Sequence, residues 1–272
     1  MTQQYFREGL FSNKVAVVTG GGTGIGFATA RKIAELGGTV WLLGRNADKL
    51  EAARNNITES GGHCFQEVCN IRNPEQVADC VKGILKRSER IDYLINNAGG
   101  QFPSPAERIS SGGWNAVIET NLNGTFYVSQ EVYKQAFAPQ KSGNIVCVVA
   151  NMWNGFPGMS HTGAARAGVV NLIKSLATEW GRRGVRVNGV APGIIGTEAL
   201  ENYDPQTRKL IERAKGFNQL GRPGTPDEVA DAIVFLMSPA SSYITGECLK
   251  IDAGESIYSP YFPPSSHQKR DL

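Results

Sequence analysis

A glycine-rich turn near the amino terminus is the first segment whose residues could do chemistry. Residues 19–26 read Thr-Gly-Gly-Gly-Thr-Gly-Ile-Gly and follow a short β-branched run at 15–18. Glycines let the backbone turn tightly and approach a pyrophosphate, and a helix that starts there directs unpaired N–H groups at the anion. The spacing of Gly20, Gly24 and Gly26 is a variant of the dinucleotide fingerprint. Such a turn can be a plain connection, but its place between a first strand and a helix favours a cofactor site.

The end of the second predicted strand, at 39–43, indicates which dinucleotide is bound. The next residues, Gly44-Arg45-Asn46, offer no carboxylate that would accept hydrogen bonds from ribose hydroxyls and repel a phosphate. A guanidinium at Arg45 can instead pair with a 2′-phosphate. The alternative is a solvated arginine at the end of a strand. The sequence favours NADP(H) as the cofactor.

One polar side chain interrupts an otherwise apolar helical stripe. At helical spacing Asn121 shares a face with Trp114, Val117, Ile118 and Thr125. A polar amide on a face that points to the core must find hydrogen-bonding partners there. The asparagine is therefore either a satisfied structural residue or part of an active site.

The elements that position these residues alternate between strand and helix patterns. Strands are expected at 15–18, 39–43, up to Val68, 91–95, 144–149, 185–191 and 247–251, and helices at 26–36, 47–60, 75–87, 113–137, 164–181 and 227–237. This alternation, with apolar strands, predicts one doubly wound α/β domain of Rossmann type over 1–272, with a parallel sheet of about seven strands and helices on both faces. The stretch 193–225 is expected to form a flap, and 256–272 an irregular tail.

Composition narrows the possible partners and location. The net charge of +3 is spread along the chain without a long basic run, so nucleic acid is not expected. The five cysteines lack CxxC or zinc spacing, which predicts free thiols in a reducing compartment and no metal site. No stretch has the length of a signal-peptide core or a membrane span. The expected location is cytoplasmic, because the ending Lys269-Arg270-Asp271-Leu272 does not match the Ser-Lys-Leu peroxisomal address.

Several motifs in order resemble the short-chain dehydrogenase/reductase family over residues 12–255. Besides the glycine turn, these are Asn96-Asn97-Ala98-Gly99, the Asn-Leu-Asn-Gly-Thr at 121–125, and Pro192-Gly193 followed by Ile195 and Thr197. The resemblance implies a dimer or tetramer. It also implies a set of cofactor-binding residues: Gly20, Thr23, Gly24, Ile25, Gly26, Arg45, Asn46, Asn70, Asn97, Ala98, Gly99, Arg166, Pro192, Gly193, Ile195 and Thr197.

The sequence departs from this family where the family carries its Ser, Tyr and Lys. Thr162 stands at the tyrosine position, Arg166 at the lysine position, and no serine occurs within 149–151. A threonine hydroxyl is a poor acid for a strongly basic alkoxide, and an arginine stays protonated and cannot relay protons. Reduction of a conjugated C=C bond demands less, because positioned donors can stabilise the enolate oxygen. Thr162, Asn121 and Arg166 are the predicted catalytic residues.

Residues 96–107 and 161–168 are similar to NADPH-dependent trans-2-enoyl-CoA reductases of the peroxisomal type and to dienoyl-CoA reductases. This resemblance implies reduction of the C=C bond of an acyl-CoA thioester. Basic residues of the predicted flap could meet CoA phosphates or simply be solvated: Arg208, Lys209, Arg213 and Arg222.

Two other readings stay open. A carbonyl reductase could use a relocated acid such as His161 or Tyr203, although a histidine beside a loop is more often structural. A catalytically inactive protein that binds NADP and responds to redox state would also keep the cofactor motifs and lose the usual triad.

Overall fold

A computed structural model describes residues 6–198, 205–206, 209 and 218–257. Seven parallel strands form one sheet in the order β3-β2-β1-β4-β5-β6-β7. Their bounds are β1 Val15–Thr19, β2 Thr39–Gly44, β3 His63–Val68, β4 Tyr93–Asn96, β5 Gly143–Val148, β6 Val185–Pro192 and β7 Cys248–Ile251. The predicted single doubly wound α/β fold is confirmed. The strand order reverses between β1 and β4, and a ligand crevice is expected at the carboxyl ends of those strands.

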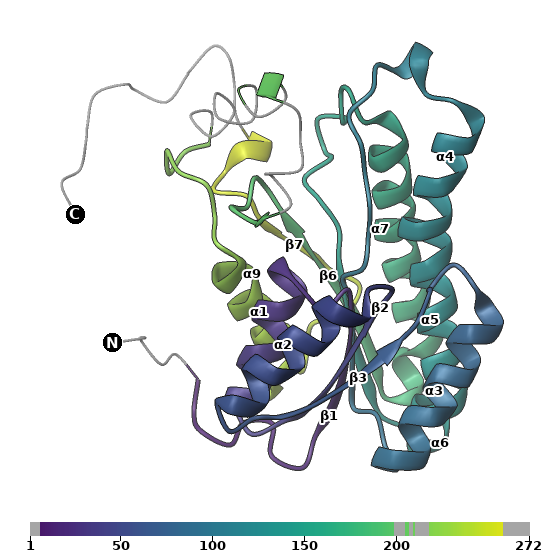
Figure 1. Ribbon diagram of the computed structural model, residues 1–272, viewed down its shortest axis with the longest axis vertical. Coiled ribbons are helices and arrows are strands. Elements are labelled where there is room, and N and C mark those ends of the chain that lie inside the picture. Colours follow the sequence, from purple (N-terminus) through teal and green to yellow (C-terminus); the bar gives the residue numbers. More distant parts are fainter. Residues whose placement is uncertain (1–5, 199–204, 207–208, 210–217, 258–272) are drawn as a thin grey trace.

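Helices cover both faces of the sheet (Figure 1). One layer comprises α1 Gly24–Glu35, α2 Ala47–Glu59 and α9 Pro226–Met237. The other comprises α3 Pro74–Ser88, α4 Ser111–Ile118, α5 Gly124–Val132, α6 Ala138–Gln140 and α7 Ser160–Trp180. Each layer packs on its own apolar core, and the central strands contribute alternate side chains to both cores. This two-sided burial explains why those strands read as continuous apolar runs.

Local signals in the sequence fix several helix starts. Asn46 precedes α2 and its side chain accepts a hydrogen bond from the Lys49 N–H at 2.9 Å. Asn73 caps α3 in the same way, with Pro74 at the first helical position. Polar side chains at these positions satisfy N–H groups that would otherwise lack partners.

The structure corrects three expectations about the elements. The edge strands β3 and β7 are partly exposed, so the strands are not buried throughout. The helix expected at 113–137 begins at Ser111, ends at Gln140, and includes π-helical segments at Glu119–Asn123 and Tyr133–Phe137. The helix expected from 164 begins at Ser160, which places His161 and Thr162 in its first turn.

Candidate cofactor and active site

The glycine turn has a geometry that strongly favours glycine. Gly20 and Gly24 have φ values of 64° and 55°, in the left-handed region that favours glycine. A Cβ on Gly26 would overlap the Gly20 carbonyl oxygen and lie 2.5 Å from Nδ2 of Asn97. Thr23, which precedes α1, makes no capping hydrogen bond through its side chain. The first N–H groups of α1 therefore keep their capacity to bind an anion.

Thr19, at the end of β1, holds the neighbouring loop in place. Its hydroxyl oxygen accepts hydrogen bonds from the Asn97 and Ala98 N–H groups, each at 3.0 Å. The side chain of Asn97 in turn donates to the carbonyls of Thr19 and Gly20, each at 3.1 Å. Asn97 therefore acts on the cofactor site by fixing the glycine turn. Sequence reasoning missed Thr19, since a threonine that ends a β-branched run carries no distinct signal.

A cleft of about 830 Å³ opens at the carboxyl ends of β1, β2 and β4. Most of the predicted cofactor residues line it: Gly20, Thr23, Gly24, Ile25, Arg45, Asn46, Asn70, Asn97, Ala98, Gly99 and Thr197. Lining residues that sequence reasoning missed are Leu43, Gly44, Lys49, Cys69, Ile71, Arg72, Thr120 and Glu198. The predicted residues are thus gathered from five separate segments into one site.

Five predicted cofactor residues are not on the lining of this cleft. One of them, Arg166, lies against Gly99. Gly26 lies behind the glycine turn, against Gly20. Gly193 and Ile195 border a neighbouring cavity of about 360 Å³, where Ile195 is buried and bridges to Gly224. Pro192 ends β6 and is also buried.

Cationic side chains give the cleft its electrostatic character. Arg45 and Lys49 are both exposed at the start of α2 and line the cleft. No carboxylate stands at the end of β2, where an acidic residue would accept hydrogen bonds from the ribose. A glycine cradle for a pyrophosphate, with two exposed cations beside it, fits a nicotinamide dinucleotide. Lys49 follows Arg45 by four residues at the start of α2, and this spacing is the sequence signal that could have identified Lys49 as a second cation of the cleft.

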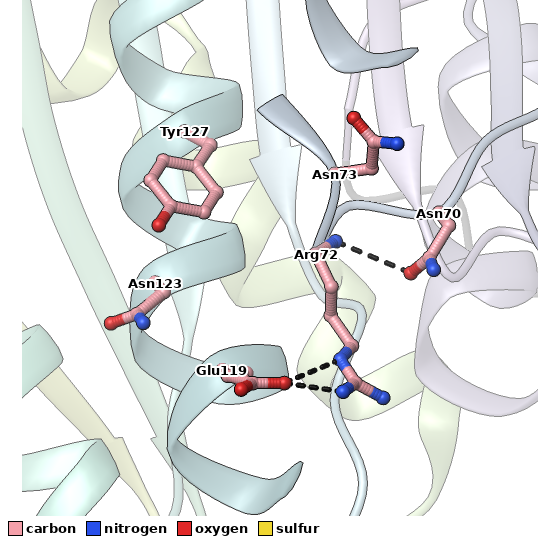
Figure 2. Close-up of a pocket in the computed structure, with 6 residues that line it drawn as sticks. All are labelled: Asn70, Arg72, Asn73, Glu119, Asn123 and Tyr127. Carbon is pink, nitrogen blue, oxygen red and sulfur yellow. Dashed lines mark hydrogen bonds and ion pairs between the residues drawn. The ribbon is translucent and has the colours of Figure 1, made fainter. Parts of the chain in front are cut away.

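A second, polar pocket of about 450 Å³ adjoins the cleft and shares Asn70 and Arg72 with it. Figure 2 shows the Arg72 guanidinium paired with Glu119, whose Oε2 accepts from Nε at 3.0 Å. The side-chain oxygen of Asn70 accepts from the Arg72 N–H at 3.2 Å. Asn70 thus holds the loop that leads into α3 and has its oxygen already engaged.

Asn121 lies in the π-helical segment Glu119–Asn123 and is fully buried. Its Nδ2 donates to the carbonyls of Gly100 and Val117, at 2.7 and 2.8 Å, and its oxygen accepts from the Gly100 N–H at 3.3 Å. The backbone thus satisfies this amide on both sides. Its action in the site is to fix the loop that follows β4.

Arg166 brings a buried cation to the inner end of the site. Its Nη1 donates to the Val148 carbonyl at 2.9 Å, and a Cβ on Gly99 would overlap its Nη2. Its Nε has no hydrogen-bonding partner within the described part of the chain. Burial lowers the pKa of Arg166 to about 10, so it stays charged at neutral pH. A buried guanidinium with an unused donor is suited to a polar ligand.

His161 and Thr162 are both fully buried in the first turn of α7. The Thr162 N–H donates to Nδ1 of His161 at 2.8 Å, and the Thr162 hydroxyl lies 3.3 Å from the same nitrogen. The Phe102 ring packs edge-on against the imidazole, with centroids 4.5 Å apart. The structure therefore joins Thr162, a predicted catalytic residue, to His161, which the carbonyl-reductase alternative names as a relocated acid.

The basic residues of the expected flap are only partly described. Tyr203, Arg208 and Arg213 lie outside the described residues, and Lys209 is exposed. Arg222 is engaged by Glu228, with nitrogen–oxygen distances of 2.6 and 3.0 Å. No helix in the described ranges has the length and apolar character needed to cross a membrane.

We expect Glu228→Ala to destabilise the protein in a pH-dependent way. Glu228 completes a capping box with Thr225 and pairs with Arg222, and its loss should cost ~1 kcal/mol. The hydrogen bond from Arg222 lowers the pKa of Glu228 to about 2. The contribution is therefore complete above the carboxyl's ordinary pKa of 4.5 and disappears as pH falls toward 2.

Urea unfolding at pH 7 and pH 3 checks this expectation. The difference between the wild type and Glu228→Ala should shrink at pH 3, while Glu59→Ala, at an exposed position of α2, should change little at either pH. An equal difference at both pH values would contradict it.

The cleft at the strand-order reversal, with its glycine turn and cations, defines a site for a nicotinamide dinucleotide. A family model described as enoyl-(acyl carrier protein) reductase matches residues 20–256. The chain belongs to the short-chain dehydrogenase/reductase family, oxidoreductases that bind a nicotinamide cofactor and act on small molecules.

Individual relatives cover nearly the whole chain. A probable 2,4-dienoyl-CoA reductase of Bacillus subtilis is 40% identical over 91% of this chain and 98% of its own. A 3-oxoacyl-[acyl-carrier-protein] reductase of Chlamydia trachomatis is 36% identical over 91% of this chain and 99% of its own. The solved structure of a citronellol catabolism dehydrogenase of Pseudomonas aeruginosa is 43% identical, covers 93% of this chain and 99% of its own, and has a TM-score of 0.84.

Proposed function

We propose that this protein is an NADPH-dependent reductase of the C=C bond of an enoyl thioester such as a trans-2-enoyl-CoA. The observation that carries the proposal is the identity of two buried residues, Thr162 and Arg166, near the cofactor cleft. Thr162 and Arg166 occupy the first two turns of α7, both buried, where the family has its tyrosine and lysine. These groups can donate hydrogen bonds, but they are poor acids for an alkoxide. The likeness to 2,4-dienoyl-CoA reductases supports the same substrate class.

The demands of C=C reduction match what these residues supply. NADPH, when bound, supplies a hydride to the β-carbon of the substrate. The negative charge then spreads to the thioester oxygen, where fixed donors in a water-poor site stabilise it most strongly. The α-carbon afterwards takes a proton from water. We propose that Thr162 and Asn121 organise the donors around this oxygen and that Arg166 binds the ribose of the cofactor.

The choice of NADPH depends on the cations at the start of α2. Arg45→Glu should raise the KM for NADPH by at least 10-fold, because it removes about one charge-assisted hydrogen bond to the 2′-phosphate. The KM for NADH should stay little changed or fall. The matched control is Arg54→Glu, which makes the same charge change on α2 at a residue that does not line the cleft. Equal KM values for NADPH in Arg45→Glu and wild type would remove the argument for this cofactor.

A substrate panel tests the proposed function. Purified protein with NADPH should oxidise the cofactor when given a trans-2-enoyl-CoA or a 2,4-dienoyl-CoA, and far more slowly with a β-ketoacyl-CoA. The likeness to a 3-oxoacyl reductase makes the keto substrate the proper competitor. A response to the keto substrate alone would favour a carbonyl reductase, and NADPH binding without turnover on any of the three would favour an inactive binding protein.

A further inference from the structure

The imidazole of His161 is held in one tautomer. The Thr162 N–H is shared between two acceptors, Nδ1 of His161 at 2.8 Å and the Met159 carbonyl at 2.9 Å. A ring nitrogen that accepts an N–H bond carries no hydrogen, so the single proton of the neutral ring lies on Nε2. In this tautomer the Thr162 hydroxyl, which lies 3.3 Å from Nδ1, donates to the same nitrogen. His161 is therefore a fixed Nε2–H donor at the start of α7.

This donor is buried without an acceptor. His161 is 0% exposed, and Nε2 makes no hydrogen bond to the residues that the structure describes. Leaving a buried N–H unpaired is unfavourable, because the group has lost its hydrogen bond to water. Only Cε1 separates Nε2 from Nδ1, and Nε2 points in a different direction from the nitrogen that Thr162 engages. The ring packs against Phe102, which is itself 38% exposed, so a partly exposed side chain borders the buried donor.

The other polar groups of the inner site have partners already. Both hydrogens of the Asn121 amide go to backbone carbonyls. Arg166 is anchored on the Val148 carbonyl and adjoins Gly99 of the cofactor cleft. The Thr162 hydroxyl has Nδ1 of His161 within reach. Among His161, Thr162, Asn121 and Arg166, the buried nitrogens without a partner in the described part of the chain are Nε2 of His161 and Nε of Arg166.

We propose that Nε2–H of His161 donates the hydrogen bond that binds the thioester carbonyl oxygen of the substrate. This inference rests on the proposed function. The hydride forms the new C–H bond at the β-carbon, the C=C electron pair moves toward the thioester oxygen, and His161 keeps its proton while water protonates the α-carbon. A neutral imidazole is a suitable electrophile for an enolate oxygen. Thr162 is a positioning residue, because its bonds to Nδ1 fix the ring and polarise Nε2–H.

Four variants test the role of the side chain. His161→Phe keeps a ring and removes the donor, and kcat with the enoyl thioester should fall about 100- to 1000-fold, as for other lost oxyanion donors. The Kd for NADPH should stay within about 2-fold, since the donor faces the substrate. His161→Gln keeps an N–H donor and should recover part of kcat. Thr162→Ala should lose about 10-fold, and Thr162→Ser should resemble the wild type.

The tautomer gives a readout on the wild type that is independent of turnover. The chain has three histidines, so ¹⁵N NMR of the labelled protein, with His161→Phe for assignment, identifies the signal of His161. The signal should show hydrogen on Nε2 and none on Nδ1 at neutral pH.

The possible results separate the inference from the proposed function. An Nδ1–H tautomer, or a His161→Phe protein with wild-type kcat, would overturn the role of His161 and leave the proposed function standing. A wild type that does not reduce enoyl thioesters would overturn both.

Discussion

Gly26→Ala should abolish cofactor binding, raising the Kd for NADPH at least 100-fold. A single Cβ at this position overlaps the Gly20 carbonyl oxygen and presses on the side chain of Asn97. A shift of either group would be unfavourable. The Asn97 amide donates hydrogen bonds to the Thr19 and Gly20 carbonyls, and the glycine turn shapes the anion site. Such overpacking costs ~1–3 kcal/mol even before binding is considered. NADPH fluorescence titration and urea unfolding measure the two effects.

A second glycine provides the matched control. Gly83 lies inside α3, and a Cβ there meets nothing within 4 Å. Gly83→Ala should therefore stabilise the protein by up to ~1 kcal/mol through helix propensity and leave NADPH binding unchanged. If Gly26→Ala binds NADPH like the wild type, the close packing of the turn is not what builds the cofactor site.

Arg166→Met should make the protein more stable and nearly inactive. The guanidinium is buried, keeps its charge and leaves Nε unpaired, so the folded protein bears a desolvation cost without full compensation. Apolar residues of similar volume that replace buried charges often stabilise by ~1–4 kcal/mol. The same change removes a buried donor from the cofactor, and kcat/KM should fall at least 100-fold.

Arg186→Met is the contrasting variant. Both of its terminal nitrogens are used, on the Ile244 and Leu236 carbonyls at 3.1 and 2.8 Å, so its loss should destabilise the protein. Urea unfolding of the two variants should therefore give free-energy changes of opposite sign. A loss of stability in Arg166→Met comparable to that in Arg186→Met would show that Arg166 is chiefly a structural residue.

The sequence predicted most of what the local backbone dictates. The glycine turn could be located because Gly20 and Gly24 have positive φ and Gly26 lacks room for a Cβ, and both requirements favour glycine. The order of strands and helices followed from periods that burial imposes on the chain. Arg45 could be predicted as a cofactor residue because the residue after the second strand contacts the ribose or its phosphate in dinucleotide-binding folds.

The start of α7 could not be predicted from its residues. Ser160, Thr162 and Gly163 are weak helix formers, and the preceding Met159 gives no capping hydrogen bond. The turn instead buries His161 and Thr162 completely, with Phe102 packed on the imidazole, and the pairing of His161 with Thr162 depends on it. Likewise the backbone carbonyls that satisfy Asn121 come from a loop and a π-helical turn, which no spacing in the sequence reveals.

The destination of the hydride distinguishes C=C reduction from carbonyl reduction. The protein is incubated with NADPH deuterated at the transferred position of the nicotinamide and a trans-2-enoyl-CoA, and the acyl product is examined by NMR and mass spectrometry. If the protein reduces the C=C bond, the product carries one deuterium at C3. In a parallel reaction in D₂O with unlabelled NADPH, it carries one deuterium at C2. Deuterium at the carbinol carbon of a hydroxy product from a β-ketoacyl-CoA, with the enoyl substrate left unreacted, would contradict it.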